Sequence, residues 1–137
     1  MSDDTFVTAV LCIDGRYRRC LVDWLSDHYG ADYVDLITEP GPDRVLTDAL
    51  CEAAQGVRRR VDVSIRAHAS QAIAMVGHDG CAGNPVDPET HQWQIARAVG
   101  ILRGWYPQLP ILGVFVDAAC QIDIVDRGEN STHPTTN

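Results

Sequence analysis

Four short apolar runs, each followed by a polar or turn-forming segment, constrain the fold of this 137-residue chain most strongly. The runs span residues 6–12, 33–38, 71–77 and 111–116. Between them, apolar residues recur at helical spacing, as they do in 17–28 and 92–105. Strands that alternate with helices are joined by right-handed crossovers, which produce a parallel sheet with helices on its faces. We therefore predict an α/β fold with a mainly four-stranded parallel sheet flanked by helices.

The segment after the second apolar run is expected to contain one continuous helix. Two prolines and a glycine at 40–42 prevent regular structure from continuing, and Asp43 can cap a helix that follows them. An apolar stripe extends to Val57, and the Arg58–Arg60 run fits the solvated end of that helix. The sequence leaves the structure of residues 61–69 open.

Length and composition favour one globular domain over residues 1–137, with a polar tail from about residue 126. The net charge of −8 has the wrong sign for binding a phosphate backbone, so we expect no nucleic-acid partner. The apolar runs are far shorter than the roughly 20 residues of a membrane span, and the first residues lack the positive charge of a signal peptide. We therefore expect a cytoplasmic protein with no membrane partner.

The five cysteines form an odd set, which argues against a disulfide framework. Cys20, Cys51 and Cys120 stand among apolar residues and are expected to be buried thiols of the core. Cys12 ends the first apolar run and Cys81 lies in the loop after the third, so these two are candidates for metal ligands or reactive thiols.

His78 and Cys81 have a spacing that lets one turn bring an imidazole and a thiolate to the same metal ion. Cys12 can supply a third ligand, because ligand sites of parallel sheets lie at the carboxyl ends of the strands. Two cysteines and one histidine with an open fourth position form a recognised catalytic zinc site. The sequence therefore predicts a zinc site on Cys12, His78 and Cys81.

The residues around the first of these cysteines point to a family. The loop reads Cys12-Ile13-Asp14-Gly15-Arg16. With the later His78-x-x-Cys81, it resembles the signature of the β-class carbonic anhydrases, which is Cys-x-Asp-x-Arg at one strand end and His-x-x-Cys at another. The resemblance implies the β-carbonic-anhydrase fold, zinc on Cys12, His78 and Cys81, and a catalytic Asp14–Arg16 dyad beside the open position of the metal.

The resemblance also implies the reaction and its partners. It predicts zinc-dependent reversible hydration of carbon dioxide to bicarbonate and a proton, by a homodimer or higher homo-oligomer. Two thiolate ligands donate more negative charge to zinc than imidazoles do, so activity is expected to rise with pH above about 7. In some family members the aspartate becomes a fourth zinc ligand when the arginine turns away. The sequence leaves this closed arrangement of Asp14 open.

Three other functions remain open from the sequence. Carbonyl sulfide or carbon disulfide would suit the same zinc chemistry, because each has an electrophilic carbon. A closed zinc site could instead stabilise a non-catalytic binding or regulatory domain. Finally, Cys12 and Arg18 have the Cys-x5-Arg spacing of certain phosphatases and reductases, in which Cys12 would be the nucleophile.

The other polar and aromatic residues are expected to have structural or surface positions. Asp79 and Asn84 are expected to satisfy turn geometry. Tryptophans at three helical positions are expected in the core or in a dimer contact: Trp24, Trp93 and Trp105. Four histidines without ligand-like neighbours are expected at the surface or in loops: His28, His68, His91 and His133.

Overall fold

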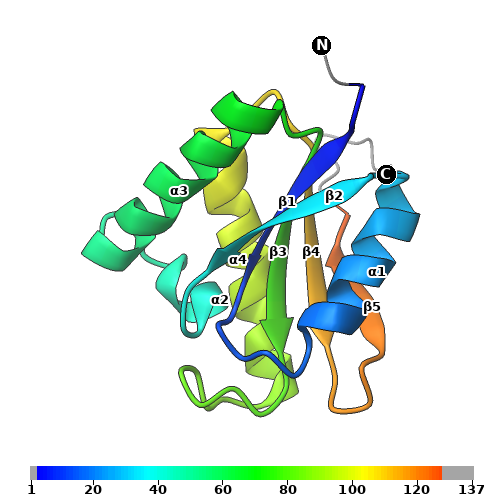
Figure 1. Cartoon of the computed structure of the whole chain (residues 1–137). Helices are drawn as coiled ribbons and strands as arrows, with labels where there is room; N and C mark the ends of the chain where they lie inside the picture. Colours follow the sequence, from blue (N-terminus) through cyan, green and yellow to red (C-terminus); the bar gives the residue numbers. More distant parts are fainter. Residues whose placement is uncertain (1–2, 128–137) are drawn as a thin grey trace, which may run out of the picture.

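The computed structural model describes residues 3–127, which form a five-stranded sheet in the order β2-β1-β3-β4-β5 (Figure 1). The four parallel strands are those predicted: β1 (Phe6–Leu11), β2 (Tyr33–Thr38), β3 (Ile73–His78) and β4 (Ile111–Val116). A fifth strand that was not predicted, β5 (Ile122–Asp126), pairs antiparallel with β4. Asp126 therefore belongs to the sheet, and the remainder of the expected polar tail from residue 128 lies outside the described residues.

Helices cover both faces of the sheet, which confirms the α/β architecture (Figure 1). On one face α1 (Arg18–Tyr29) buries Leu21 and Leu25 against the strands. The other face packs against α2 (Pro42–Val45), α3 (Glu52–His68) and α4 (Pro88–Trp105). Because β1, β3 and β4 are covered on both sides, their residues are almost all buried, as continuous apolar runs require.

The expectation of one continuous helix from Asp43 through Arg60 is wrong. Helix α2 ends at Val45, and α3 begins only at Glu52. Polar side chains in the intervening segment hydrogen-bond the backbone and so compete with helix formation, since Thr47 Oγ1 donates to the Arg44 carbonyl and Asp48 Oδ1 accepts from Leu50 N. The Arg58–Arg60 run lies inside α3, which continues to His68 and so covers nearly all of the segment 61–69 that the sequence left open.

A disulfide joins Cys20 in α1 to Cys120 in the turn between β4 and β5, so the expectation that these two residues are unpaired thiols is wrong. The partners are 100 residues apart in the sequence, and only the folded sheet brings them together. Cys51 is free, as expected, and its Sγ accepts a hydrogen bond from Ala54 N at the start of α3. This sulfur therefore caps the helix.

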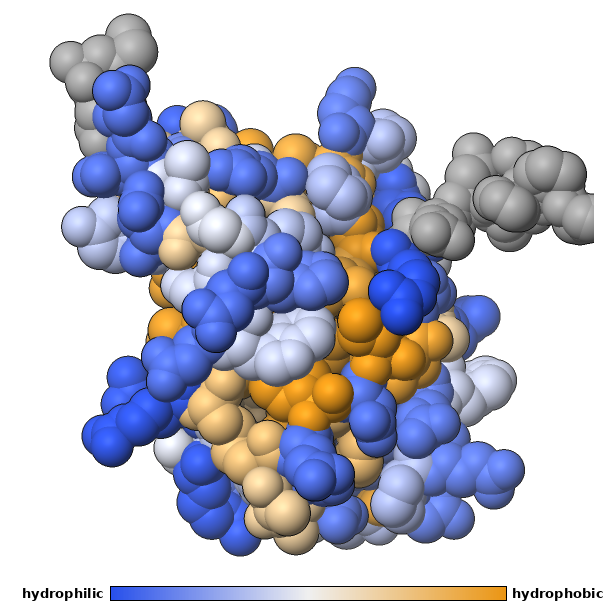
Figure 2. Space-filling view, turned by 90° about the vertical axis from the view of Figure 1, so that its right-hand side faces the viewer, coloured by the Kyte–Doolittle hydropathy of each residue, from blue (hydrophilic) through white to orange (hydrophobic). Residues whose placement is uncertain are grey.

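The sheet face under α1 is covered by one helix only and retains apolar surface. Figure 2 shows hydrophobic atoms at the surface on this side of the molecule, and Ile122 and Ile124 of β5 are only partly buried here.

None of the helices within residues 3–127 has both the length and the apolar character that crossing a bilayer requires.

Close packing of α4 on β4 predicts opposite effects for two glycine-to-alanine substitutions. A Cβ at Gly113 would lie 2.8 Å from Ile95 Cγ2 and 2.9 Å from Val99 Cγ2, whereas a Cβ at Gly100 on α4 would meet nothing within 4 Å. We expect Gly113→Ala to lower the free energy of unfolding by about 1–3 kcal/mol through overpacking. Gly100→Ala should raise it by up to about 1 kcal/mol through helix propensity. Chemical denaturation measures both, and equal effects would contradict the packing argument.

Candidate metal centre

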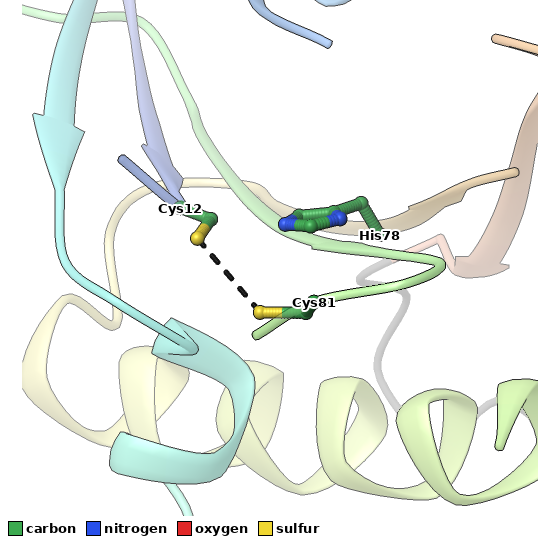
Figure 3. A group of neighbouring side chains, drawn as sticks. All are labelled: Cys12, His78 and Cys81. Carbon is green, nitrogen blue, oxygen red and sulfur yellow. Dashed lines mark hydrogen bonds between the residues drawn. The ribbon is translucent and has the colours of Figure 1, made fainter. Parts of the chain in front are cut away.

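Three potential metal ligands converge where β1 and β3 end (Figure 3). Cys12 follows β1, His78 is the last residue of β3, and Cys81 lies in the loop after it. All three are buried, and their ligand atoms lie within 4.8 Å of one another. The Sγ atoms of Cys12 and Cys81 are 3.8 Å apart. The structure thus brings Cys12 together with His78 and with Cys81, which lies 69 residues later in the sequence.

This geometry fits a zinc ion. Two sulfurs bound at about 2.3 Å in tetrahedral geometry lie about 3.8 Å apart, which matches the observed separation of Cys12 and Cys81. His78 Nδ1 donates to the Asp79 carbonyl at 2.8 Å, so the lone pair of the ring is on Nε2. That Nε2 is buried and has no hydrogen-bond partner among the described residues. Two thiolates and one such imidazole form a donor set that suits zinc.

The surroundings of Cys81 make its thiol reluctant to ionise without a metal. Burial raises the pKa of Cys81, and the neighbouring Cys12 raises it further. The backbone amides of Gly83 and Asn84 act in the opposite direction, because they hydrogen-bond the sulfur and lower its pKa. Since thiolates are the metal-binding form, uptake of a metal here must release protons.

Asp14 and Arg16 form a bidentate ion pair beside the three candidate ligands. Arg16 Nη2 lies 2.6 Å from Asp14 Oδ2, and Arg16 Nε lies 3.0 Å from Asp14 Oδ1. These hydrogen bonds lower the pKa of Asp14 to about 2, and the carboxylate in turn raises the pKa of Arg16. Arg16 thus holds the Asp14 carboxylate in this structure. This is the open arrangement, in which Asp14 pairs with Arg16 and is not a fourth metal ligand.

Tyr17 also belongs to the site, although the sequence pattern did not indicate this. Its ring lies 4.6 Å from that of His78, measured between centroids, and its hydroxyl donates to the Asp79 carbonyl at 3.2 Å. That same carbonyl accepts from His78 Nδ1, so Tyr17 supports the orientation of the imidazole. Tyr17 directly follows the Cys12–Arg16 motif, and this position was the available signal that it belongs to the site. However, an aromatic residue at the start of a helix also fits an ordinary place in the core.

A pocket of about 430 Å³ opens beside the candidate metal ligands. It is lined by Cys12, Ile13, Asp14, Pro40, Ala82 and Gly83. At its edge the loop before α2 meets the metal-site loop backbone to backbone, because a Cβ at Gly41 would lie 2.7 Å from the Gly83 carbonyl oxygen. Gly41 also has φ +54°, which favours glycine. The pocket was not predicted, because it needs the Pro-Gly-Pro turn to fold against a distant loop.

Two residues considered at the sequence level have different roles from those expected. His91 is fully buried in α4, so the expectation of a surface or loop position is wrong. Its Nδ1 lies 2.6 Å from the buried carboxylate of Asp43. Asn84 is 1% exposed, and its side chain also bonds Asp43, so it does more than satisfy a local turn.

The other histidines and the tryptophans are partly where the sequence placed them. His68 ends α3, and its Nδ1 pairs with Asp35 near the surface. His28 is exposed, as expected, whereas His133 lies outside the described residues. Trp24 and Trp105 are partly buried against the core, but Trp93 is 63% exposed and is not a core residue.

Comparison with known proteins agrees with the motif and the geometry. No curated protein matches the chain. The family model described as Putative carbonic anhydrase matches residues 2–126, which include all five strands, the three candidate ligands and the Asp14–Arg16 pair. The resemblance to carbonic anhydrases is thereby confirmed. The chain belongs to the putative carbonic anhydrase family.

Proposed function

We propose that this chain is a single-domain, zinc-dependent carbonic anhydrase that reversibly hydrates carbon dioxide to bicarbonate and a proton. One observation carries the proposal: the buried Cys12, His78 and Cys81 converge on one point beside the Asp14–Arg16 pair, at an open pocket. Family membership supports the same activity.

Each part of the site has a task in this reaction. Cys12, His78 and Cys81 would hold zinc, which as a Lewis acid lowers the pKa of water and supplies a nucleophile near neutral pH. Asp14 would accept a hydrogen bond from the attacking oxygen and thereby orient it. Arg16 keeps Asp14 ionised and fixes its two oxygens with a fork of N–H donors. The side chains of Ile13, Pro40 and Ala82 give the pocket an apolar wall, which suits carbon dioxide.

Replacing Asp14 tests the proposed catalytic pair. We expect Asp14→Ala to retain one zinc per chain but to lose at least about 100-fold in carbon dioxide hydration, because the oriented acceptor is gone. Stopped-flow hydration assays on protein of known zinc content measure this change. Asp79→Ala is the matched control, since it removes a carboxylate from the adjacent loop, and it should leave the rate near that of the wild type. Loss of zinc from Asp14→Ala would instead indicate that Asp14 is a ligand.

Replacing Arg16 makes a separate prediction about pH. Arg16→Ala should lower the hydration rate without moving the midpoint of its pH profile. Arg16 lowers the pKa of Asp14 to about 2, and without it the pKa rises only toward an ordinary carboxyl value. Asp14 therefore stays ionised from about pH 6 to about pH 9 in both proteins. Rates measured across that range check the prediction, and a midpoint shifted by more than about one pH unit would contradict it.

Arg16 should also affect stability in acid. Because the folded-state pKa of Asp14 is lowered, the pair stabilises the fold above the ordinary carboxyl pKa, and this contribution is lost as the pH falls through about 2.

The open pocket bears on the alternative functions. Carbonyl sulfide and carbon disulfide have the same linear shape and electrophilic carbon as carbon dioxide, so they belong in the same assay series. The pairing of Asp14 with Arg16 and the pocket beside Cys12 favour an open catalytic site over a closed structural one. A carboxylate in the Cys12–Arg18 loop disfavours a phosphatase, because it would repel a phosphate.

We also propose a homodimer or higher homo-oligomer in the cytoplasm. The apolar surface beside α1 supports self-association, which light scattering tests. The free cysteines Cys12, Cys51 and Cys81 support a reducing compartment, whereas the Cys20–Cys120 disulfide weighs against it. The redox state of Cys20 and Cys120 in freshly lysed cells decides between these two indications.

A further inference from the structure

Behind the metal-site loop lies a buried polar cluster that the proposed reaction does not use. It consists of Asp43 in α2, Asn84 in the loop after Cys81, and His91 in α4. Asp43 and Asn84 are 1% exposed and His91 is 0% exposed. Within residues 3–127, no other ion pair has both side chains this deeply buried.

The hydrogen bonds of the cluster fit together without conflict. His91 Nδ1 donates to Asp43 Oδ2 at 2.6 Å, because a carboxylate oxygen can only accept. Asn84 Nδ2 donates to Asp43 Oδ1 at 3.0 Å and to Gln94 Oε1 at 2.6 Å, which uses both of its hydrogens. The side chain of Asn84 is therefore held from α2 and α4 at once.

The cluster touches β3, which ends at His78, and the loop that carries Cys81. Asp43 lies against β3, since a Cβ at Gly77, the residue before His78, would be 2.8 Å from Asp43 Oδ2. Asn84 lies three residues after Cys81, and its backbone N–H bonds the Cys81 carbonyl at 3.2 Å. The position of Asn84 thus determines how the loop presents Cys81.

Stability alone is a poor reason for such a cluster. Burying a carboxylate and an imidazole costs desolvation free energy, and well-packed apolar residues of similar volume are often at least as stabilising. A hydrogen-bonded polar network instead specifies one conformation, since displacing a member leaves buried groups unpaired. Within this cluster, His91 Nε2 has no hydrogen-bond partner among the described residues. The conformation specified here is that of the loop bearing Cys81.

We propose that Asp43, His91 and Asn84 are positioning residues that hold the 79–84 loop in its metal-binding conformation before the metal arrives. The inference rests on the proposed zinc site. It adds that retention of zinc depends on the Asp43–His91 pair through Asn84. In the conformation that the cluster preserves, the sulfurs of Cys12 and Cys81 are 3.8 Å apart, a separation that already suits zinc.

Zinc affinity of the full-length chain, measured by competition with a chromophoric chelator, tests the proposal. We expect His91→Leu and Asn84→Ala each to weaken zinc binding by about 10- to 100-fold, the range found for groups that orient metal ligands. Both should also weaken the tetrahedral d–d bands after cobalt(II) substitution. His91→Asn should recover most of the affinity, because its amide nitrogen can replace Nδ1 as the donor to Asp43.

A matched control separates positioning from general destabilisation. Ser70→Ala removes a buried hydrogen bond to Thr8 near the opposite edge of the sheet and should leave zinc affinity unchanged. Wild-type affinity in both Asn84→Ala and His91→Leu, or an equal loss in Ser70→Ala, would overturn the proposal. If His91→Leu does not fold, Asn84→Ala decides, because it keeps the Asp43–His91 pair. A wild-type chain that binds no zinc would overturn the proposed function itself, and this inference with it.

Discussion

Cys12→Ser should reduce zinc binding by more than about 100-fold, beyond the usual cost of losing a residue that only supports a ligand. Cys12 is buried, and its sulfur lies 3.8 Å from that of Cys81, so a poorly ionised hydroxyl in its place removes one of three converging donors. Carbon dioxide hydration should fall to the background rate. Metal analysis after dialysis and stopped-flow assays measure the two effects.

Cys51→Ser provides the matched control for this loss. Cys51 is also free, but it caps α3 and lies outside the group of candidate ligands. The Cys51→Ser variant should bind one zinc per chain and retain the activity of the wild type. Full zinc occupancy and turnover in Cys12→Ser would refute the three-ligand site, whereas the same loss in both variants would point to an effect of thiol removal in general.

The second large effect is expected from opening the Cys20–Cys120 disulfide. Cys20→Ser should lower the free energy of unfolding by about 4–5 kcal/mol, because a cross-link that closes a loop of about 100 residues strongly restricts the unfolded chain. For a chain of this size the loss corresponds to a fall in Tm of at least about 10 °C. Thermal and denaturant unfolding of the zinc-loaded proteins measure it.

Two comparisons show whether the disulfide is the cause. A thiol reductant should bring the wild type down to the stability of Cys20→Ser and should not affect that variant further. Cys51→Ser should be neutral or slightly stabilising, because serine is a good helix N-cap. Equal stability of wild type and Cys20→Ser under oxidising conditions would contradict the assignment.

The sequence predicted the parallel strands and the convergence of Cys12, His78 and Cys81, because both depend on local patterns. Continuous apolar runs identify strands that are covered on both faces. Parallel topology then places the carboxyl ends of β1 and β3 at one edge of the sheet, where Cys12 and His78 are found. The close spacing of His78 and Cys81 completed the prediction, since a short turn suffices to bring their side chains together.

Features that depend on long-range contacts could not be read in the same way. The Cys20–Cys120 pairing needs α1 and the β4–β5 turn to meet in space, and each cysteine alone looks like a core thiol. Strand β5 is short and carries Asp123 between apolar residues, so its pattern is weak without the edge of β4 beside it. The break between α2 and α3 has a different cause, because it depends on local hydrogen bonds of Thr47 and Asp48 that the helical periodicity does not reveal.

The buried polar cluster was missed for a related reason. His91 lies on a helix among polar neighbours in sequence, and its burial follows only from the docking of α4 against α2 and β3. Asn84 resembles any asparagine of a turn until Asp43 is placed beside it. Lone polar residues acquire roles from partners that lie far away in the chain, and a single sequence does not name those partners.

The contact between Gly41 and Gly83 has a practical consequence for redesign. Because main chain meets main chain there, the separation of the two loops is fixed by their paths, and a larger residue at either position would force them apart. An engineer who wishes to admit bulkier molecules to the pocket should therefore leave both glycines untouched. Libraries should vary Ile13 and Ala82, which line the cavity with exposed side chains and offer shape without disturbing the scaffold.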